Sequence, residues 1–176
     1  MMHWIRPLLL AVATFGFSTA ALADKSAGDT VDDNTLAASV KTALIGESEV
    51  KGRDINVEVY KGRVQLAGFL DDKAMINKAV EVAKGVDGEK EVINRLAVRA
   101  PKRSMGTTLD DTTLAGKVKS GISSDDGSKA LKVNVEVNDG VVLLSGFVHG
   151  ANAKAAAEAS AKKAGATKVL NYIDVQ

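Results

Sequence analysis

Cysteine is absent from the 176 residues, and aromatic side chains are few. Without cysteine the chain has no disulfide framework, no thiol nucleophile, no thiolate metal site and no cysteine for lipid attachment. Basic and acidic residues number 23 and 22, and the chain has one tryptophan, two tyrosines and four phenylalanines. Nucleic-acid binding usually needs a basic field and aromatic stacking platforms, so this composition argues against it.

Catalytic and metal-binding constellations are also missing from the sequence. Of the two histidines, only His149 lies outside the first few residues, and no acidic cluster accompanies it. The stretch Gly85 to Gly88 is too short for a nucleotide fingerprint and does not follow a strand. We therefore expect no catalytic residues, no metal site, no cofactor and no enzymatic activity.

No apolar run is long enough to span a bilayer, which takes roughly 20 residues. The strongly apolar stretch from Leu8 to Phe17 follows the basic Arg6 and precedes Ala21-Leu22-Ala23. A short apolar core with a small-x-small site after it is typical of a secretory signal peptide. We expect residues 1–23 to be a signal peptide cleaved after Ala23, and the mature chain to have no transmembrane segment.

An internal repeat organises the rest of the chain. Four blocks recur at a constant offset of 78 residues without a gap, and a fifth recurs at 77. Two copies of about 67 residues are too few for a solenoid, which needs at least three stacked units, so tandem compact domains are favoured. The blocks begin at Asp32, Val40, Ile55, Leu66 and Val92 in the first copy, and at Asp110, Val118, Val133, Leu144 and Val169 in the second.

Each copy has the pattern helix, strand, strand, helix, strand. In the first copy, apolar residues recur at helical spacing from Leu36 to Leu44 and alternate with polar ones over 55–60. A turn at Lys61-Gly62 leads to a second strand, and a second helix precedes a third strand at 92–98. We expect an α+β fold of two tandem α-β-β-α-β domains, each with a three-stranded mixed sheet covered on one face by two helices.

The acidic pairs of the sequence are interpreted as helix-start signals rather than catalytic carboxylates, because aspartate is a favoured N-terminal cap. Asp33 is expected to cap the first helix of the first copy, and Asp71 the second. The pairs are Asp32-Asp33, Asp71-Asp72, Asp110-Asp111 and Asp125-Asp126.

Domain boundaries follow from the repeat and from composition. Residues 24–31 are expected to form a flexible tail before the first domain, 32–98. Residues 99–109 contain Pro101, Gly106 and a polar run, which is typical of a linker. The second domain then covers 110–176. The sequence leaves open whether the two domains pack together.

These motifs together resemble the BON domain family. The residues that carry the resemblance are the Asp-Asp helix start, the strand beginning at Ile55, the Gly68-Phe69 and Gly146-Phe147 pairs, and the closing stretches at Asn94 and Asn171. The resemblance covers nearly the whole mature chain. It implies a periplasmic location, induction by osmotic or envelope stress, phospholipid binding and chaperone-like behaviour.

The Gly-Phe pair in each copy has two interpretations. Phe69 and Phe147 could form an exposed apolar wedge, or they could fill the small core of each module while Gly68 and Gly146 let a helix pack closely. We favour the core interpretation, because one phenylalanine per module remains to supply a large buried area.

Asn94 and Asn171 lie in the third strand of their copies, at the phase of inward-facing valines. Each could contact a ligand. We favour the interpretation that each side chain satisfies backbone groups near the sheet edge. Both residues, like the Gly-Phe pairs, are predicted to be structural family-signature positions.

The cations Arg99, Lys102 and Arg103 form the one basic cluster that stands out in the sequence. They are candidate contacts for anionic lipid headgroups, at roughly 1 kcal/mol per charge near such a surface. A solvated linker is the favoured alternative. The helix from Asn152 to Lys163 is rich in alanine, so it lacks the large apolar face of an interfacial helix. Gly116 and Gly121 weaken the helix before it.

Two functions remain after these exclusions. The first is a periplasmic, non-enzymatic osmotic or envelope-stress protective protein that binds phospholipid or envelope surfaces through both domains. The second is a soluble holdase-type chaperone for unfolded periplasmic proteins. The cores are duplicated and the surfaces are not, so specific function is expected where the copies differ or at the basic linker.

Overall fold

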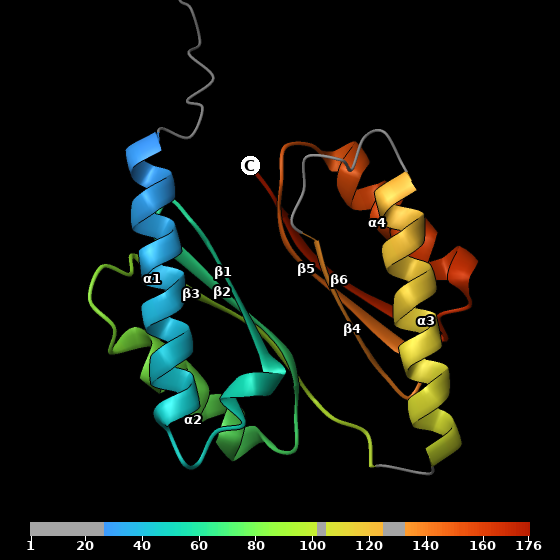
Figure 1. Cartoon of the computed structure of the whole chain (residues 1–176), viewed down its shortest axis with the longest axis horizontal. Helices are drawn as coiled ribbons and strands as arrows, with labels where there is room; N and C mark the ends of the chain where they lie inside the picture. Colours follow the sequence, from blue (N-terminus) through green and yellow to red (C-terminus); the bar gives the residue numbers. More distant parts are fainter. Residues whose placement is uncertain (1–26, 102–104, 125–132) are drawn as a thin grey trace, which may run out of the picture.

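The computed structural model describes residues 27–101, 105–124 and 133–176, which form two modules of the same architecture (Figure 1). The expected signal peptide and the candidate contacts Lys102 and Arg103 lie outside the described residues, as does the pair Asp125-Asp126. The predicted fold class is confirmed, because each module contains two helices and a three-stranded mixed sheet.

The elements of the two modules follow the same order. The first module contains α1 (Ala27–Gly46), a 3-10 turn (Gly52–Asp54), β1 (Ile55–Tyr60), β2 (Arg63–Leu70), α2 (Lys73–Lys84) and β3 (Glu91–Val98). The second contains α3 (Met105–Ser124), β4 (Val133–Asn138), β5 (Val141–Val148), α4 (Ala151–Ala164) and β6 (Lys168–Val175).

The central strand of each sheet is the second strand of the hairpin. In the first module β2 pairs antiparallel with β1 and parallel with β3, and β5 does the same with β4 and β6. Both hairpin turns place two consecutive residues at positive φ. These are Lys61-Gly62 (51° and 79°) and Asp139-Gly140 (52° and 75°). Two positive φ values match the twist of a tight hairpin, so the turn residues fix the register of each sheet.

The hydrophobic core of each module lies between the sheet and its two helices. In the first module, Val40 and Leu44 of α1 and Ala79 of α2 pack with Val64 and Leu66 of β2. The second module repeats this arrangement with smaller side chains on α4, where the buried positions are Ala153, Ala157 and Ala161.

Two helices begin earlier than the sequence suggested. α1 begins at Ala27, inside the expected tail, and α3 begins at Met105, inside the expected linker. Asp33 and Asp111 therefore lie within helices. The prediction that the pairs Asp32-Asp33 and Asp110-Asp111 mark the helix starts is wrong. Both oxygens of Asp33 accept hydrogen bonds from the turn amides of Lys61 and Gly62, each at 2.8 Å.

Asp111 makes the same pair of bonds with the amides of Asp139 and Gly140, each at 2.8 Å. A carboxylate caps a helix only when its oxygens are free to accept the first amides of that helix. Here the amides of the hairpin turn donate to both carboxylate oxygens, so each aspartate connects its helix to the turn of the neighbouring hairpin. The second helix does have a carboxylate cap, one residue beyond the predicted Asp71. Asp72 accepts from the amide of Met75 at 2.8 Å.

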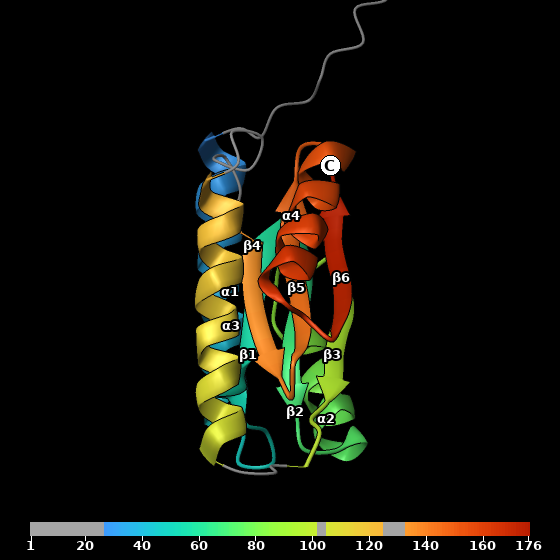
Figure 2. The same ribbon diagram turned by 90° about the vertical axis from the view of Figure 1, so that its right-hand side faces the viewer.

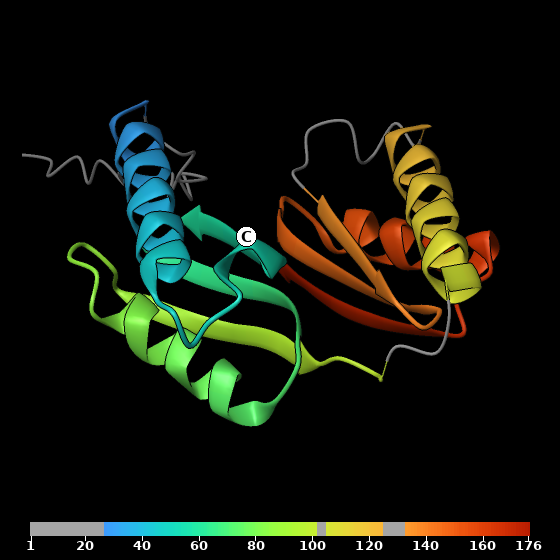
Figure 3. The same cartoon turned by 60° about the horizontal axis from the view of Figure 1, so that its bottom comes forward.

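The two modules pack through their sheets. The helices cover the outer face of each sheet, and the remaining faces of the two sheets meet, as Figures 1 and 3 show. Figure 2 looks through the second module and shows the strands of both sheets lying over one another. The molecule is therefore a four-layer sandwich of helices, sheet, sheet and helices, and its two sheet faces that carry no helices, called the inner faces below, bury each other.

Candidate functional site

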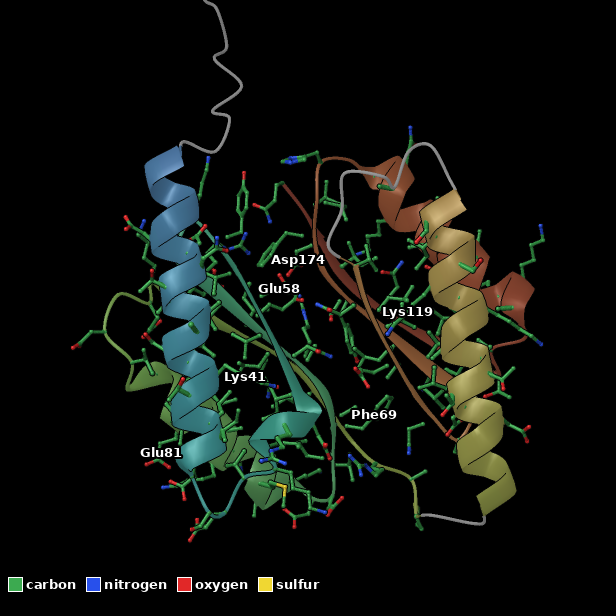
Figure 4. The ribbon with its side chains drawn as sticks, viewed as in Figure 1. Lys41, Glu58, Phe69, Glu81, Lys119 and Asp174 are labelled. Atoms are coloured by element: carbon green, nitrogen blue, oxygen red, sulfur yellow. The ribbon has the colours of Figure 1, made fainter. Side chains whose placement is uncertain are left out.

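Phe69 lies in the interface between the modules, not in the core beneath the helices. It is buried with Ala67 and with Leu143 of the second module. Figure 4 shows Phe69 between the two sheets. The prediction that it fills the core of its own module is therefore wrong. The alternation of β2 explains this, because Phe69 points to the face opposite Leu66 and Leu70, which do face the helices.

Phe147 occupies the equivalent position in the second module and also faces the interface. Its ring centroid lies 5.7 Å from that of Tyr60, and the guanidinium carbon of Arg63 lies 5.8 Å from its ring centroid. Both partners belong to the first module. The two phenylalanines of the Gly-Phe pairs thus hold the modules together, one through apolar contact and the other through aromatic and cation–π contacts.

Polar residues of the first hairpin strands join the modules reciprocally. The side-chain amide of Asn56 donates to Glu136 at 3.0 Å, and that of Asn134 donates to Glu58 at 2.9 Å. Asn134 and Glu136 are the repeat equivalents of Asn56 and Glu58. The two hydrogen bonds are therefore related as contacts across a two-fold axis are.

A second polar group surrounds the buried side chain of Gln65, which is 1% exposed. Its amide donates to the carboxylate of Asp174 at 2.8 Å, and its oxygen accepts from the amide of Gly146 at 2.7 Å. Arg95 lies 3.4 Å from the same carboxylate and 5.4 Å from the ring centroid of Tyr172. This network gives the interface a charged and directional component.

Gly68 is required by the backbone, not by helix packing. Its φ is +147°, and a Cβ at this position would lie 2.2 Å from the carbonyl oxygen of Asp54. Gly146 has a φ of +120°. In the first module the glycine lets β2 pass the start of β1, so the expectation that it admits a helix is wrong.

The two asparagines of the third strands both accept from the backbone two residues on. Asn94 is exposed, and its oxygen accepts from the amide of Leu96 at 2.9 Å. The oxygen of Asn171 accepts from the amide of Ile173 at 3.3 Å. These contacts agree with the interpretation that the asparagines satisfy backbone groups.

Asn171 makes further contacts that Asn94 does not share. Its amide donates to the carbonyl of Lys154 at 3.0 Å and to Glu158 at 3.1 Å. Hydrogen bonds from Lys162 and Asn171 lower the pKa of Glu158 below its ordinary value of 4.5. In the second module the asparagine thus fastens β6 to α4.

Arg99 is engaged within the first module. Its guanidinium donates to Asp54 at 2.6 Å and to the carbonyl of Phe69 at 2.7 Å, and it lies 3.8 Å from Asp71. Two carboxylates therefore neutralise the cation that was expected to be a candidate lipid contact. Lys41 is a second engaged cation. Burial lowers its pKa, opposed by Asp54 and Glu136, and its ammonium donates to backbone carbonyls.

A groove lies between α3 and α4 of the second module, with a volume of about 740 Å³. Small residues form its floor, and two lysines, Lys117 and Lys163, line it. At the repeat positions of Ser160 and Ala164 the first module has Val82 and Val86, which pack against its core. The lining residues are Gly116, Lys117, Ser120, Gly121, Ser160, Lys163 and Ala164.

Sequence reasoning missed both the polar network and the groove. Gln65 shares its face of β2 with the apolar Ala67 and Phe69. Apolar residues at both phases of a central strand are typical of burial on both faces, and that pattern is the signal that could have indicated a buried Gln65. For the groove, the sequence indicates Gly116 and Gly121 only as weak points of a helix. A Cβ on Gly121 would lie only 3.3 Å from the Cβ of Ser160, so this glycine lets α3 and α4 approach closely. Small residues on both helices are the signal that could have indicated a depression along this contact.

Within 27–101, 105–124 and 133–176, no group of three or more histidine, cysteine, aspartate or glutamate residues is arranged to hold a metal ion. None of the helices in these ranges has the length and apolar character of a membrane span.

The fold and its sites define a class of tandem α+β repeat protein whose two modules are paired through their sheets. The sequence matches the family model described as BON domain twice, over residues 32–100 and 110–176. The chain belongs to the BON domain family.

Three curated relatives are similar over most of the chain. Osmotically-inducible protein Y of Escherichia coli is 38% identical, covering 77% of this chain and 68% of its own length. The outer membrane lipoprotein DolP of Haemophilus influenzae is 35% identical, over 85% of this chain and 79% of its own. A 21 kDa hemolysin of Actinobacillus pleuropneumoniae is 31% identical, over 85% of this chain and 77% of its own length.

Proposed function

We propose that this chain is an exported, non-enzymatic envelope protein with a role in osmotic or envelope stress, and that it binds anionic phospholipid surfaces. The names of its relatives, one osmotically inducible and one an outer membrane lipoprotein, support the first part. The N-terminal pattern ending at Ala23 supports export. The domain boundaries proposed from the repeat are 32–98 and 110–176.

The groove between α3 and α4 is the observation that carries the lipid proposal. Lys117 and Lys163 are both exposed on its walls, and neither forms an ion pair with another of the described residues. Two cations beside a depression of small residues suit a phosphate headgroup with part of its glycerol backbone. Binding of this kind needs no insertion of α4, whose buried positions are alanines.

The linker contributes less to this proposal than the sequence suggested. Arg99 forms ion pairs with Asp54 and Asp71. Binding of Arg99 to a lipid phosphate would therefore require breaking these ion pairs. The groove also lies where the two copies differ, and difference between copies is where a specific function is expected. We therefore assign the headgroup contact to the second module.

Reversal of the groove charges tests the assignment. Full-length protein is sedimented with vesicles of phosphatidylglycerol and phosphatidylcholine at low and high salt, and Lys117→Glu/Lys163→Glu is compared with the wild type. Two reversed charges should weaken binding by at least about tenfold, because each cation contributes roughly 1 kcal/mol at an anionic surface. Salt should weaken the wild type in the same direction.

The matched control is Lys73→Glu/Lys84→Glu, which reverses two exposed lysines of α2 in the first module. This variant has the same net charge as the groove variant and should bind as the wild type does. Equal loss in both double variants would assign the effect to net charge and contradict the groove. Absence of co-sedimentation at low salt would overturn lipid binding altogether, and suppression of client aggregation by the same sample would then favour the holdase function.

A further inference from the structure

The inner faces of the two modules are complementary in a way that follows the repeat. Where the copies carry the same residues, the contacts are reciprocal. Asn56 bonds to Glu136, and Asn134 bonds to Glu58. Figure 4 shows Glu58 and Asp174 between the sheets. A surface that makes reciprocal contacts recognises its own copy, as in an isologous dimer.

Where the copies differ, the differences complement each other. Arg95 and Tyr172 occupy the same position of the repeat, and the guanidinium of one lies over the ring of the other. Asp174 pairs with Arg95 at 3.4 Å, while the first module has Ala97 at the position of Asp174. The first module therefore lacks the carboxylate that its own arginine needs, and the second module supplies it.

This pattern makes the pairing selective. Two copies of the first module placed face to face would bring Arg95 against Arg95 without a carboxylate. Two copies of the second would leave Asp174 without its cation. Like charges across an interface cost affinity, and a selective surface uses that cost against wrong partners. The favoured pair is therefore one first module with one second module.

Nothing in these contacts requires both modules to come from the same chain. Six residues separate the end of β3 at Val98 from the start of α3 at Met105. Fully extended, six residues reach at most about 20 Å. Within one chain the short connection gives a high effective concentration, so the closed monomer predominates in dilute solution.

We propose that the inner face of the first module also receives the second module of another copy of this chain, giving an exchanged dimer with two identical module interfaces. Exchange of matching parts between copies adds no new type of contact and breaks none of those described. The inference concerns the inner faces alone and stands independently of lipid binding at the outer groove.

Mixing two oppositely charged full-length variants tests the exchange. Arg95→Asp places two carboxylates in the interface, and Asp174→Arg places two cations there. In either variant alone, positions 95 and 174 carry like charges that repel each other across the module interface. This holds in the closed monomer and in an exchanged dimer. In the mixture, an exchanged dimer pairs Asp with Arg at one interface and Arg with Asp at the other. We expect light scattering to detect a dimer whose dissociation constant is at least about tenfold lower than that of either variant alone.

The double variant Arg95→Asp/Asp174→Arg keeps the test decisive if a single variant folds poorly. It restores the pair within one chain, so it should be monomeric in dilute solution with the circular dichroism of the wild type. Labelled wild type should form dimers with unlabelled wild type at high concentration. It should not form them with the double variant, because that combination places like charges at both interfaces.

The control uses an ion pair that faces away from the interface. Lys78 and Glu81 lie 3.5 Å apart on α2, and Figure 4 shows Glu81 on the outer side of the first module. Mixing Lys78→Glu with Glu81→Lys should give no more dimer than the wild type gives at the same concentration, because neither substitution touches the inner faces. The proposal is overturned if the mixture of interface variants stays monomeric, if the control mixture associates equally, or if wild type and double variant exchange freely.

Discussion

At the scale of single residues, the aspartates and asparagines that sequence reasoning singled out bond mainly to backbone groups. Asp33 and Asp111 hold hairpin turns, and Asn171 fastens a strand to a helix. Each has the residue type that was expected to accept or donate locally. What differs is the partner, because a carboxylate inside a helix can reach a turn that is distant in sequence but adjacent in the fold.

Gly68 gives the sharpest prediction at this scale. Gly68→Ala should destabilise the protein by about 3 kcal/mol, because its φ is +147° and the new Cβ would meet the carbonyl oxygen of Asp54. The measurement is the free energy of unfolding in urea. Gly85→Ala is the matched control, since Gly85 has a φ of −84° and a Cβ there would come no closer than 3.5 Å to the carbonyl oxygen of Val82. It should change stability by less than about 1 kcal/mol. Equal effects would contradict the backbone role.

At the scale of elements, the order and type of every strand and α-helix in the described residues could be predicted, and the 3-10 turn at Gly52–Asp54 was missed. The repeat doubled each signal, since a pattern seen at Ile55 was seen again at Val133, and the hairpin pairs Lys61-Gly62 and Asp139-Gly140 fixed the strand register. Helix starts were predicted less well. A cap signal is local, and the residue that carries it is open to distant partners, as Asp33 illustrates.

The tie between α4 and β6 depends on the charge of Glu158. Its pKa is lowered in the folded chain by Lys162 and Asn171, so the unfolded chain binds more protons at acidic pH. The stabilisation is complete above about 4.5 and is lost as pH falls through the lower folded pKa. Solvent screens this partly exposed group, so Glu158→Gln should cost only about 0.5–1 kcal/mol at neutral pH, and this cost should shrink as pH falls below about 4.5.

Urea unfolding of both proteins between about pH 7 and about pH 3 measures this difference. The control is Glu81→Gln, which removes an exposed carboxylate of α2 whose ion pair with Lys78 spans 3.5 Å. Its effect on stability should stay small throughout the range. A cost for Glu158→Gln that persists at acidic pH would show that side-chain packing, not charge, fastens the two elements.

At the scale of the whole molecule, the pairing of the modules could not be predicted. Strands β1 and β4 alternate apolar residues with asparagine and glutamate, and this alternation is the same whether the polar face meets water or another polar face. The central strands carry a partial signal, because the apolar Ala67, Phe69 and Leu143 occupy the phase opposite the helix-facing residues. That pattern indicates that the face is covered and does not indicate what covers it. The groove was equally hidden, since it depends on the distance between two helices and not on either alone.

The absence of cysteine allows the paired arrangement to be tested directly. Ser48→Cys and Ala155→Cys place single dyes on exposed positions of the two modules, with no other thiol to compete. Phe69 is buried against Leu143 across the interface, so Phe69→Ala in this background should raise the population with separated modules at least about tenfold. Single-molecule energy transfer between the two dyes measures that population.

The control is Ile45→Ala, which removes a similar apolar residue that is already 49% exposed. It should leave the distribution of transfer efficiencies unchanged. Identical distributions for Phe69→Ala and the parent would mean that the reciprocal Asn–Glu pairs and the Arg95–Asp174 pair hold the modules without the apolar contact, and that the interface is stabilised mainly by its polar network.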